Sequence, residues 1–155
     1  MKRRHLRADA IEMCRRAREY RPDIAFGADI IAGFPTETDE MFQNTLDIVE
    51  ECDLTFLHIF PYSEREGTPA AKMPQVEQAI RKARAKLLRE AGKVQLQKLL
   101  RNNLNKEVQV VVEKGNNGRS ENFSPVKLSG DLSAGSLVTV RTTAIDGDFL
   151  RADVL

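Results

Sequence analysis

The stretch that decides the fold is Gly27-Ala28-Asp29-Ile30-Ile31-Ala32-Gly33-Phe34-Pro35-Thr36-Glu37-Thr38. Its first half belongs to an apolar run over residues 24–32 that is interrupted only at Gly27 and Asp29. Near-continuous apolar character is typical of a parallel strand covered on both faces, so we expect a buried strand here.

A turn and a helix start follow this strand. Gly33 makes the turn, Pro35 stiffens it, and Thr36 or Thr38 can cap the next helix. Ligands of α/β folds bind beside the carboxyl ends of parallel strands, where such turns lie. We therefore expect any chemistry of this chain near Gly33.

A second strand over residues 55–60, ended by Pro61, completes a strand–helix–strand unit with a right-handed crossover. Two parallel strands can neither bury both faces nor close a barrel. Either a partner chain supplies the rest, or this chain is the C-terminal part of a longer protein, and we favour the second interpretation.

The composition is that of a soluble globular protein: 155 residues, 41% hydrophobic, 30% charged, with a net charge of +1. No apolar run approaches the roughly 20 residues that span a membrane, so we expect a cytoplasmic protein without membrane contact. Cys14 and Cys52 are the only cysteines and form no CxxC motif. We expect two buried, reduced thiols and no metal site contained within this chain.

A long basic helix is predicted over residues 76–102. Its expected packing stripe consists of apolar side chains: Val76, Ile80, Ala83, Leu87, Val94 and Leu99 or Leu100. The Lys and Arg residues of this helix form either a solvated face or a stripe that faces RNA.

Short strands are predicted after Asn103, over residues 107–113, 123–128, 136–142 and 149–155. Residues 114–118 are expected to form a turn, and Asp146-Gly147-Asp148 is a hairpin signal. The pattern predicts a small β-barrel or sandwich. The expected domains are thus residues 1–75, a connecting helix at 76–103 and a β-domain at 104–155.

Two stretches carry a resemblance to a known family. The Gly27–Thr38 stretch and Leu57-His58-Ile59-Phe60-Pro61-Tyr62-Ser63-Glu64-Arg65-Glu66-Gly67-Thr68-Pro69-Ala70 are similar to the later strands of radical S-adenosylmethionine (SAM) methylthiotransferases. Met1-Lys2-Arg3-Arg4-His5 resembles the segment that precedes them, and the β-domain resembles the tRNA-binding TRAM domain of these enzymes. The sequence from Leu57 to Ala70 is most similar to that of family members that modify threonylcarbamoyladenosine beside the tRNA anticodon.

The resemblance implies an α/β plus all-β fold: a partial (β/α) barrel, half of a TIM-like barrel, then the long helix and a TRAM-like β-barrel. It also implies SAM and two [4Fe-4S] clusters as cofactors and tRNA as partner. The chain departs from the family because the CxxxCxxC motif and the auxiliary cysteines are absent. We therefore expect an inactive fragment of a methylthiotransferase whose N-terminal part is missing, with no catalytic or metal-binding residue of its own.

Site residues follow from the same resemblance. The expected cofactor-binding residues are Asp29, Gly33, Glu37, His58 and Phe60, and the expected substrate-binding residues are Tyr62 and Arg65. Structural alternatives remain open for most of them: an ion pair for Asp29, a tight turn at Gly33, a helix start at Glu37, a core position for His58, and a loop salt bridge of Arg65 with Glu64 or Glu66.

For the β-domain the expected RNA-binding residues are cationic, amide and aromatic: Lys114, Arg119, Asn122, Phe123, Lys127 and Arg141. Phe123 can instead belong to the core. The rival function is a non-catalytic RNA-binding adaptor with a TRAM-like module. A (β/α) hydrolase fragment ranks last because the chain has no activated nucleophile motif.

Overall fold

The computed structural model describes residues 5–155, so most of the Met1–His5 segment used in the resemblance lies outside the described residues. The chain divides into two compact units, one ending at Gln95 and the other spanning Leu96–Leu155. The boundary lies within helix α3 (Gln78–Asn102), and each unit is described by itself.

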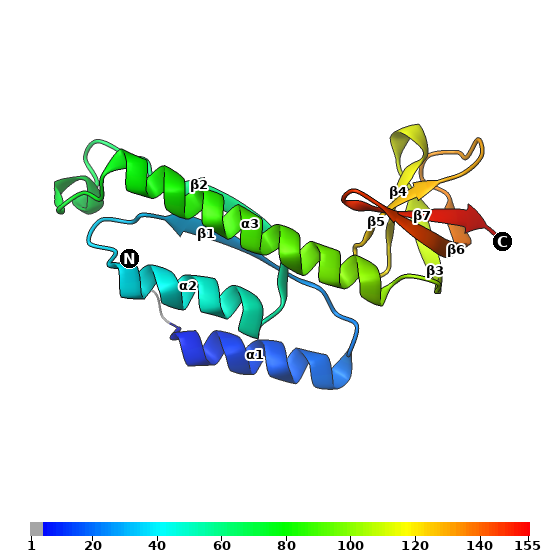
Figure 1. Ribbon diagram of the computed structural model, residues 1–155, viewed down its shortest axis with the longest axis horizontal. Helices are drawn as coiled ribbons and strands as arrows, with labels where there is room; N and C mark the ends of the chain where they lie inside the picture. The colour runs from blue at the N-terminus through cyan, green and yellow to red at the C-terminus, as the bar shows by residue number, and fades with distance from the viewer. Residues whose placement is uncertain (1–4) are drawn as a thin grey trace. The chain divides into compact units, whose positions relative to one another are not determined.

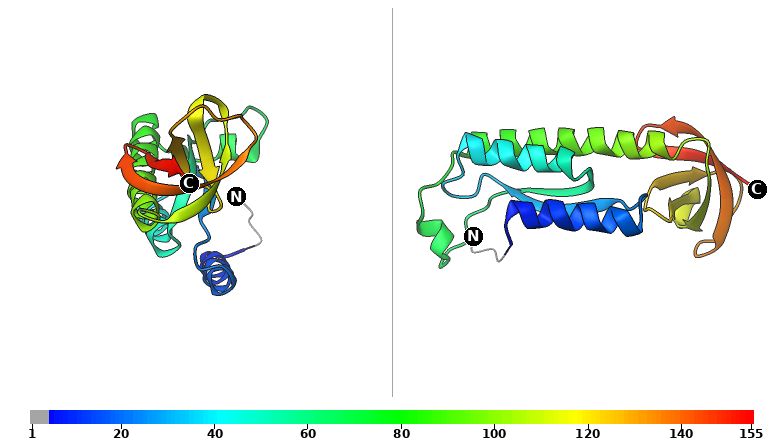
Figure 2. Two further views of the ribbon diagram at one scale, coloured as in Figure 1. Left: turned by 90° about the vertical axis from the view of Figure 1, so that its right-hand side faces the viewer. Right: turned by 90° about the horizontal axis from the view of Figure 1, so that it is seen from below.

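The first unit is built on two parallel strands, β1 (Phe26–Ala32) and β2 (Leu54–Pro61), joined by helix α2 (Asp39–Glu51). Helix α1 (Arg7–Tyr20) precedes β1, and the 3-10 helix η1 (Pro69–Lys72) follows β2 (Figure 1). The right-hand view of Figure 2 shows helices α1 and α2 running alongside the two strands. The described residues of this unit form the expected α/β arrangement, with a sheet of two strands.

Local sequence explains where α2 begins. The side chain of Thr38 accepts a hydrogen bond from the Met41 backbone N–H at 3.2 Å, which makes Thr38 the cap rather than Thr36. Asp39 and Glu40 occupy the first turn, where the helix dipole favours negative charge.

The prediction that β1 is covered on both faces is wrong for this chain. Alternate β1 residues, from Phe26 to Ala32, pack into a core with the helices, whereas Gly27, Asp29 and Ile31 are exposed. The pleat sends successive side chains to opposite faces, and all of the described helical packing lies on one of them. The apolar run therefore marks a strand with one open face.

The expected packing stripe of α3 is also mostly wrong. Ile80, Leu87 and Val94 are 40%, 47% and 66% exposed, and of the expected stripe Leu100 is fully buried. In the first unit the buried face of α3 instead carries six other residues: Arg81, Arg84, Ala85, Leu88, Gly92 and Gln95. Both the expected and the observed face have helical spacing. The observed face can pack against the strands because Ala85 is small and both arginines have hydrogen-bond partners.

The second unit is a closed five-stranded barrel with the strand order β3-β4-β5-β7-β6. These strands are β3 (Glu107–Val112), β4 (Asn117–Ser120), β5 (Pro125–Leu128), β6 (Leu137–Asp146) and β7 (Phe149–Val154), with a 3-10 helix η2 at Lys114–Asn116. Valine and leucine side chains fill the interior, among them Val110, Val126, Val140 and Leu150. This confirms the expected small β-barrel.

Strand β4 was not expected, because residues 114–118 carry strong turn signals. Gly118 allows the strand: an added Cβ would collide with the Val110 side chain and lie 2.7 Å from the Val111 carbonyl oxygen. The glycine thus marks a close approach of two strands rather than a turn. Among residues 5–155 no helix has both the length and the apolar character needed to cross a bilayer.

Candidate functional site

The open face of the β1–β2 sheet brings several expected site residues together. Asp29 pairs with His58 in the parallel register, and Ile31 pairs with Phe60 one step further along. All four are exposed. The sheet therefore places a carboxylate and an imidazole on directly opposed positions of two strands, beside an aromatic side chain.

A cavity of about 420 Å³ lies where the two strands end. Its lining comes from both strands and from the loop after β2: Ile31, Phe60, Pro61, Tyr62, Ser63, Arg65, Thr68 and Ala70. Three expected site residues, Phe60, Tyr62 and Arg65, thus share one cavity. Among the described residues Arg65 has no acidic partner, so the alternative loop salt bridge with Glu64 or Glu66 is not formed.

Tyr62 is held in place at the edge of this cavity. Its ring packs edge-on against Phe34 with 5.4 Å between centroids, and the Arg81 guanidinium lies 5.4 Å from its centroid. The Tyr62 backbone N–H donates to the carbonyl of Ala32 at 2.8 Å. These contacts connect the end of β1 to the loop after β2.

Gly33 has a packing reason to be glycine. Its φ is +73°, and an added Cβ would lie 2.6 Å from Cγ of Arg81 and 3.1 Å from its Cα. Its backbone N–H donates to the Glu37 carboxylate at 2.8 Å. The side of Gly33 where a Cβ would stand is therefore occupied by α3.

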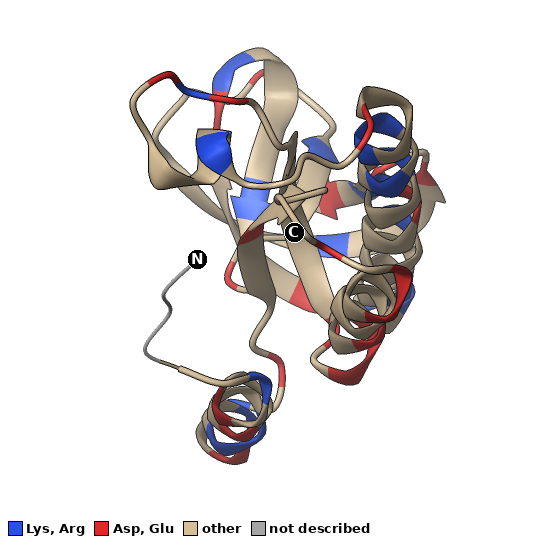
Figure 3. Cartoon of the chain, turned by 90° about the vertical axis from the view of Figure 1, so that its left-hand side faces the viewer, with Lys and Arg blue, Asp and Glu red and all other residues tan. Residues whose placement is uncertain are grey.

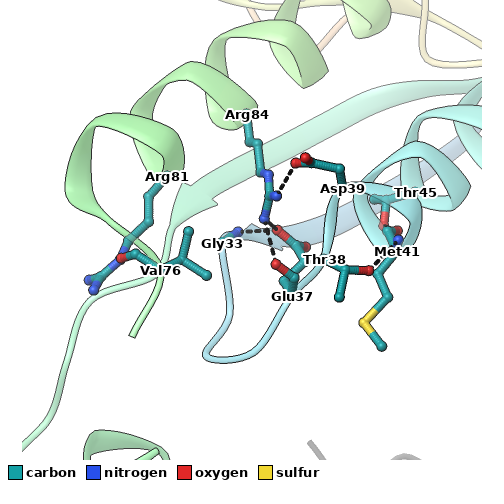
Figure 4. Close-up of polar contacts among 9 residues, drawn as sticks. All are labelled: Gly33, Glu37, Thr38, Asp39, Met41, Thr45, Val76, Arg81 and Arg84. Atoms are coloured by element: carbon teal, nitrogen blue, oxygen red, sulfur yellow. Dashed lines mark hydrogen bonds and ion pairs between the residues drawn. The ribbon is translucent and has the colours of Figure 1, made fainter. Parts of the chain in front are cut away.

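The Glu37 carboxylate is engaged within the protein. It accepts from Gly33 N–H and, at 2.7 Å, from Nη1 of Arg84, which also donates to the Glu37 carbonyl oxygen at 3.0 Å (Figure 4). Nη2 of Arg84 reaches Asp39 at 2.6 Å. In this arrangement Glu37 fixes the loop between β1 and α2.

Arg81 fixes the loop after β2, as Arg84 and Glu37 fix the loop after β1. Its guanidinium donates to the carbonyl oxygen of Tyr62 at 3.3 Å and to Glu64 at 3.0 Å, and Nε donates to the Val76 carbonyl oxygen at 2.6 Å. Arg81 and Arg84 lie one turn apart, and both are buried. Each arginine holds one of the two loops that follow the strands.

Sequence reasoning missed these two arginines. Their spacing with Ala85 and Leu88 follows a helical face, which is a readable signal. A search for apolar periodicity assigns arginine to an exposed face, although arginine is the cation best suited to a buried position with ion-pair partners.

On the barrel, Arg119 and Phe123 form one exposed group. Phe123 is 57% exposed, so the core alternative is wrong, and the Arg119 guanidinium lies 4.7 Å from its ring centroid. Arg119 also lies 3.9 Å from Glu113. The pair presents an aromatic ring with a cation stacked on it.

Asn122 lies next to this group, but its amide is used inside the barrel. Its oxygen accepts from the hydroxyls of Ser120 at 2.9 Å and Ser124 at 2.8 Å, and its nitrogen donates to the Asn103 side chain at 3.2 Å. Ser124 is fully buried, so this network satisfies polar groups that water cannot reach.

The remaining expected RNA-binding cations lie on three elements: Lys114 in η2, Lys127 in β5 and Arg141 in β6. Lys127 donates to Asp146 at 3.1 Å, and together with Arg151 it lowers the pKa of that carboxyl. Arg141 forms an ion pair with Glu107 on the neighbouring strand, and Lys114 is exposed in η2.

No group of three or more His, Cys, Asp or Glu side chains within residues 5–155 is placed to hold a metal ion. Cys14 and Cys52 are both buried in the core of the first unit. Burial, together with the neighbouring Cys14, raises the pKa of the Cys52 thiol to about 11. Both thiols therefore serve as packing groups in this core.

No family model matches the chain. A threonylcarbamoyladenosine tRNA methylthiotransferase of Rickettsia prowazekii is 50% identical over 151 residues, covering 97% of this chain and 36% of that protein. An enzyme of the same name from Aquifex aeolicus is 37% identical, covering 79% of this chain and 30% of its own length. A tRNA-2-methylthio-N(6)-dimethylallyladenosine synthase of Pseudoalteromonas atlantica is 36% identical, covering 100% of this chain and 34% of that protein.

The chain thus spans about a third of the length of the curated relatives it matches. The relatives include methylthiotransferases named for two different modified adenosines, and each of these matches extends over both units of the chain. The chain is therefore a homologue of the C-terminal region of tRNA methylthiotransferases.

Proposed function

We propose that the protein is the C-terminal part of a radical SAM methylthiotransferase that acts on N6-threonylcarbamoyladenosine next to the tRNA anticodon. The observation that carries this choice is the 50% identity to a threonylcarbamoyladenosine enzyme, against 36% for a dimethylallyladenosine enzyme. Both values cover nearly the whole chain, so they compare the same residues. The protein would work on tRNA in the cytoplasm.

We divide the chain into three parts: residues 1–75 would belong to a half (β/α) barrel, residues 76–103 to a connecting helix, and residues 104–155 to a TRAM-like β-barrel. The two-stranded sheet supports this proposal because each strand has one edge without a strand partner among the described residues. A face carrying Asp29, His58 and Phe60 in register suits the inner wall of such a barrel.

SAM would bind along this wall and at the strand ends, near Asp29, Gly33, His58 and Phe60. When bound, SAM supplies the methyl group and the radical chemistry of the family. Asp29 has a carboxylate suited to a cationic or hydroxyl group, and Phe60 has a ring suited to stacking. Glu37 would act indirectly, because its carboxylate is held by Arg84 and orients the Gly33 turn.

The modified base would enter the cavity at the end of β2. Arg65 lines it without an acidic partner among the described residues, and a guanidinium pairs bidentately with a carboxylate or phosphate. Threonylcarbamoyladenosine carries a carboxylate, whereas dimethylallyladenosine does not. Tyr62 would support the base with its immobilised ring.

The two [4Fe-4S] clusters would be held by the N-terminal part of the enzyme, outside this chain. This assignment is supported by the donor set: the chain has two cysteines, and both are packed in one core. The chain alone would then be inactive. The barrel would hold tRNA through Arg119 and Phe123, with Lys114, Lys127 and Arg141 contributing charge.

The test is nucleoside analysis of tRNA from the source organism with and without the gene. Disruption should remove 2-methylthio-N6-threonylcarbamoyladenosine and leave the unmethylthiolated nucleoside, while any 2-methylthio-dimethylallyladenosine persists. Loss of the latter alone would refute the substrate assignment. A gene cassette that encodes only this chain should fail to restore the modification. Restoration would refute the proposal that activity requires clusters held by the N-terminal part of the enzyme.

A further inference from the structure

Helix α3 carries a second set of cations besides the two buried arginines. Lys82, Lys86, Arg89 and Lys93 are all exposed, and they lie within the first unit. With 3.6 residues per turn, their side chains fall within an arc of about 60° and extend over about 16 Å of helix axis. Figure 3 shows Lys and Arg recurring along this helix. We name these four residues the basic stripe.

Little within the described part of the chain neutralises the basic stripe. Lys82 and Lys93 have no carboxylate partner among residues 5–155, and Lys86 is 3.8 Å from Glu90 in a pair whose side chains are 77% and 56% exposed. Such an exposed pair contributes little. Arg89 uses one nitrogen to donate to the Ile59 carbonyl oxygen at 3.1 Å, which fixes the stripe relative to β2.

The chemistry of the stripe fits a phosphate backbone better than a protein surface. Buried centres of protein interfaces are depleted in lysine and enriched in aromatic residues. The basic stripe has neither aromatic nor apolar side chains, whereas the exposed apolar residues Ile80, Leu87 and Val94 lie on a different arc of the helix. Four cations in a row match a chain of regularly spaced phosphates.

We propose that the basic stripe of α3 binds the phosphate backbone of tRNA, as a contact additional to the barrel surface. This inference rests on the proposed function, since it names a further surface for the same partner. The stripe adds affinity and orientation without reading bases, because lysine contacts to phosphate carry no sequence information.

The test measures binding of a tRNA transcript to the whole chain over a salt titration. In the stripe variant Lys82→Gln, Lys86→Gln and Lys93→Gln are combined. In the control variant Arg16→Gln, Lys72→Gln and Lys106→Gln are combined, which removes the same charge from exposed positions elsewhere. Circular dichroism should give the same melting curve for all three proteins, because no altered side chain is buried.

The stripe variant should lose about 2–3 units of the slope of log affinity against log salt. Between about 50 and about 200 mM salt, the unaltered chain should therefore lose roughly 16–64 times more of its affinity than the stripe variant does. The control variant should keep the original slope to within about one unit.

Equal losses in the two variants would overturn the inference, because net charge alone would then explain them. An unchanged slope in the stripe variant would also overturn it, while leaving the proposed function intact. If the unaltered chain binds no tRNA even at low salt, tRNA binding by this chain fails, and the stripe proposal falls with it.

Discussion

Replacing Arg84 by methionine should destabilise the first unit strongly. The Arg84 side chain is 7% exposed and that of Glu37 11% exposed, with 2.7 Å between nitrogen and oxygen. Arg84→Met keeps an apolar stem of similar length, but of the hydrogen-bond donors to the Glu37 carboxylate within residues 5–155 it leaves only the Gly33 N–H. Removing one partner of a buried ion pair costs about 3–5 kcal/mol, because the remaining charge stays buried without compensation.

The exposed side of the same cluster provides a matched control. Asp39 accepts from Arg84 at 2.6 Å, but its side chain is 100% exposed, so water replaces the lost contact. Asp39→Asn should therefore leave the unfolding curve of the first unit almost unchanged. The contrast isolates burial as the cause, since both carboxylates contact the same guanidinium.

A double-mutant cycle tests the coupling directly. Glu37→Gln combined with Arg84→Met should cost less than the sum of the two single changes, by about 1–3 kcal/mol. Urea unfolding followed by tyrosine fluorescence measures this in the first unit alone. Both tyrosines, Tyr20 and Tyr62, lie there, and the chain has no tryptophan. A loss below about 1 kcal/mol for Arg84→Met, or additive single changes, would refute the argument.

Three further outcomes are expected. Gly33→Ala should destabilise the first unit by about 1–3 kcal/mol, because an alanine there combines a left-handed backbone with a Cβ contact of 2.6 Å to α3. Gly135→Ala shares the positive φ without any neighbour within 4 Å, so it should cost about 1 kcal/mol, and equal costs would contradict the packing reason. In the native protein, Cys14 and Cys52 should both resist iodoacetamide at pH 8, because both are buried. With a pKa of about 11, only about one Cys52 thiol in a thousand is also ionised at that pH. Rapid labelling, detected by mass spectrometry, would contradict this. Phe123→Ala should weaken tRNA binding by about 1–3 kcal/mol without changing the salt slope, since stacking involves no counterion release, and a changed slope would count against stacking.

Local signals in the sequence determine the elements of the first unit. An apolar run, a glycine and a threonine cap predict β1, its turn and α2, and the structure has them at Phe26–Ala32 and Asp39–Glu51. These features depend on backbone conformation and on contacts between near neighbours, which a single sequence displays. The barrel strands follow from turn signals in the same way, apart from β4.

The grouping of side chains on one face of β2 was also within reach of the sequence, whereas the open face was not, because the apolar run of β1 predicted a strand covered on both faces. Residues two apart on a strand share a face, so His58 and Phe60 could be grouped before their positions were known. The same rule extends to Tyr62 just beyond the strand. The pairing of Asp29 with His58 depends on strand register and needed the tertiary structure.

Tertiary structure alone decided which side of α3 is buried. Helical spacing offered two faces, and the apolar one with Ile80, Leu87 and Val94 is exposed because the partners of the other face come from distant loops. Glu37 is 47 positions from Arg84, and their pairing turns a charged helix face into a packing face. The same holds for Asn122, whose amide serves a buried network built with Asn103, 19 positions away. Charge compensation between residues far apart in the chain leaves no periodic trace in the sequence, so only the folded chain reveals it.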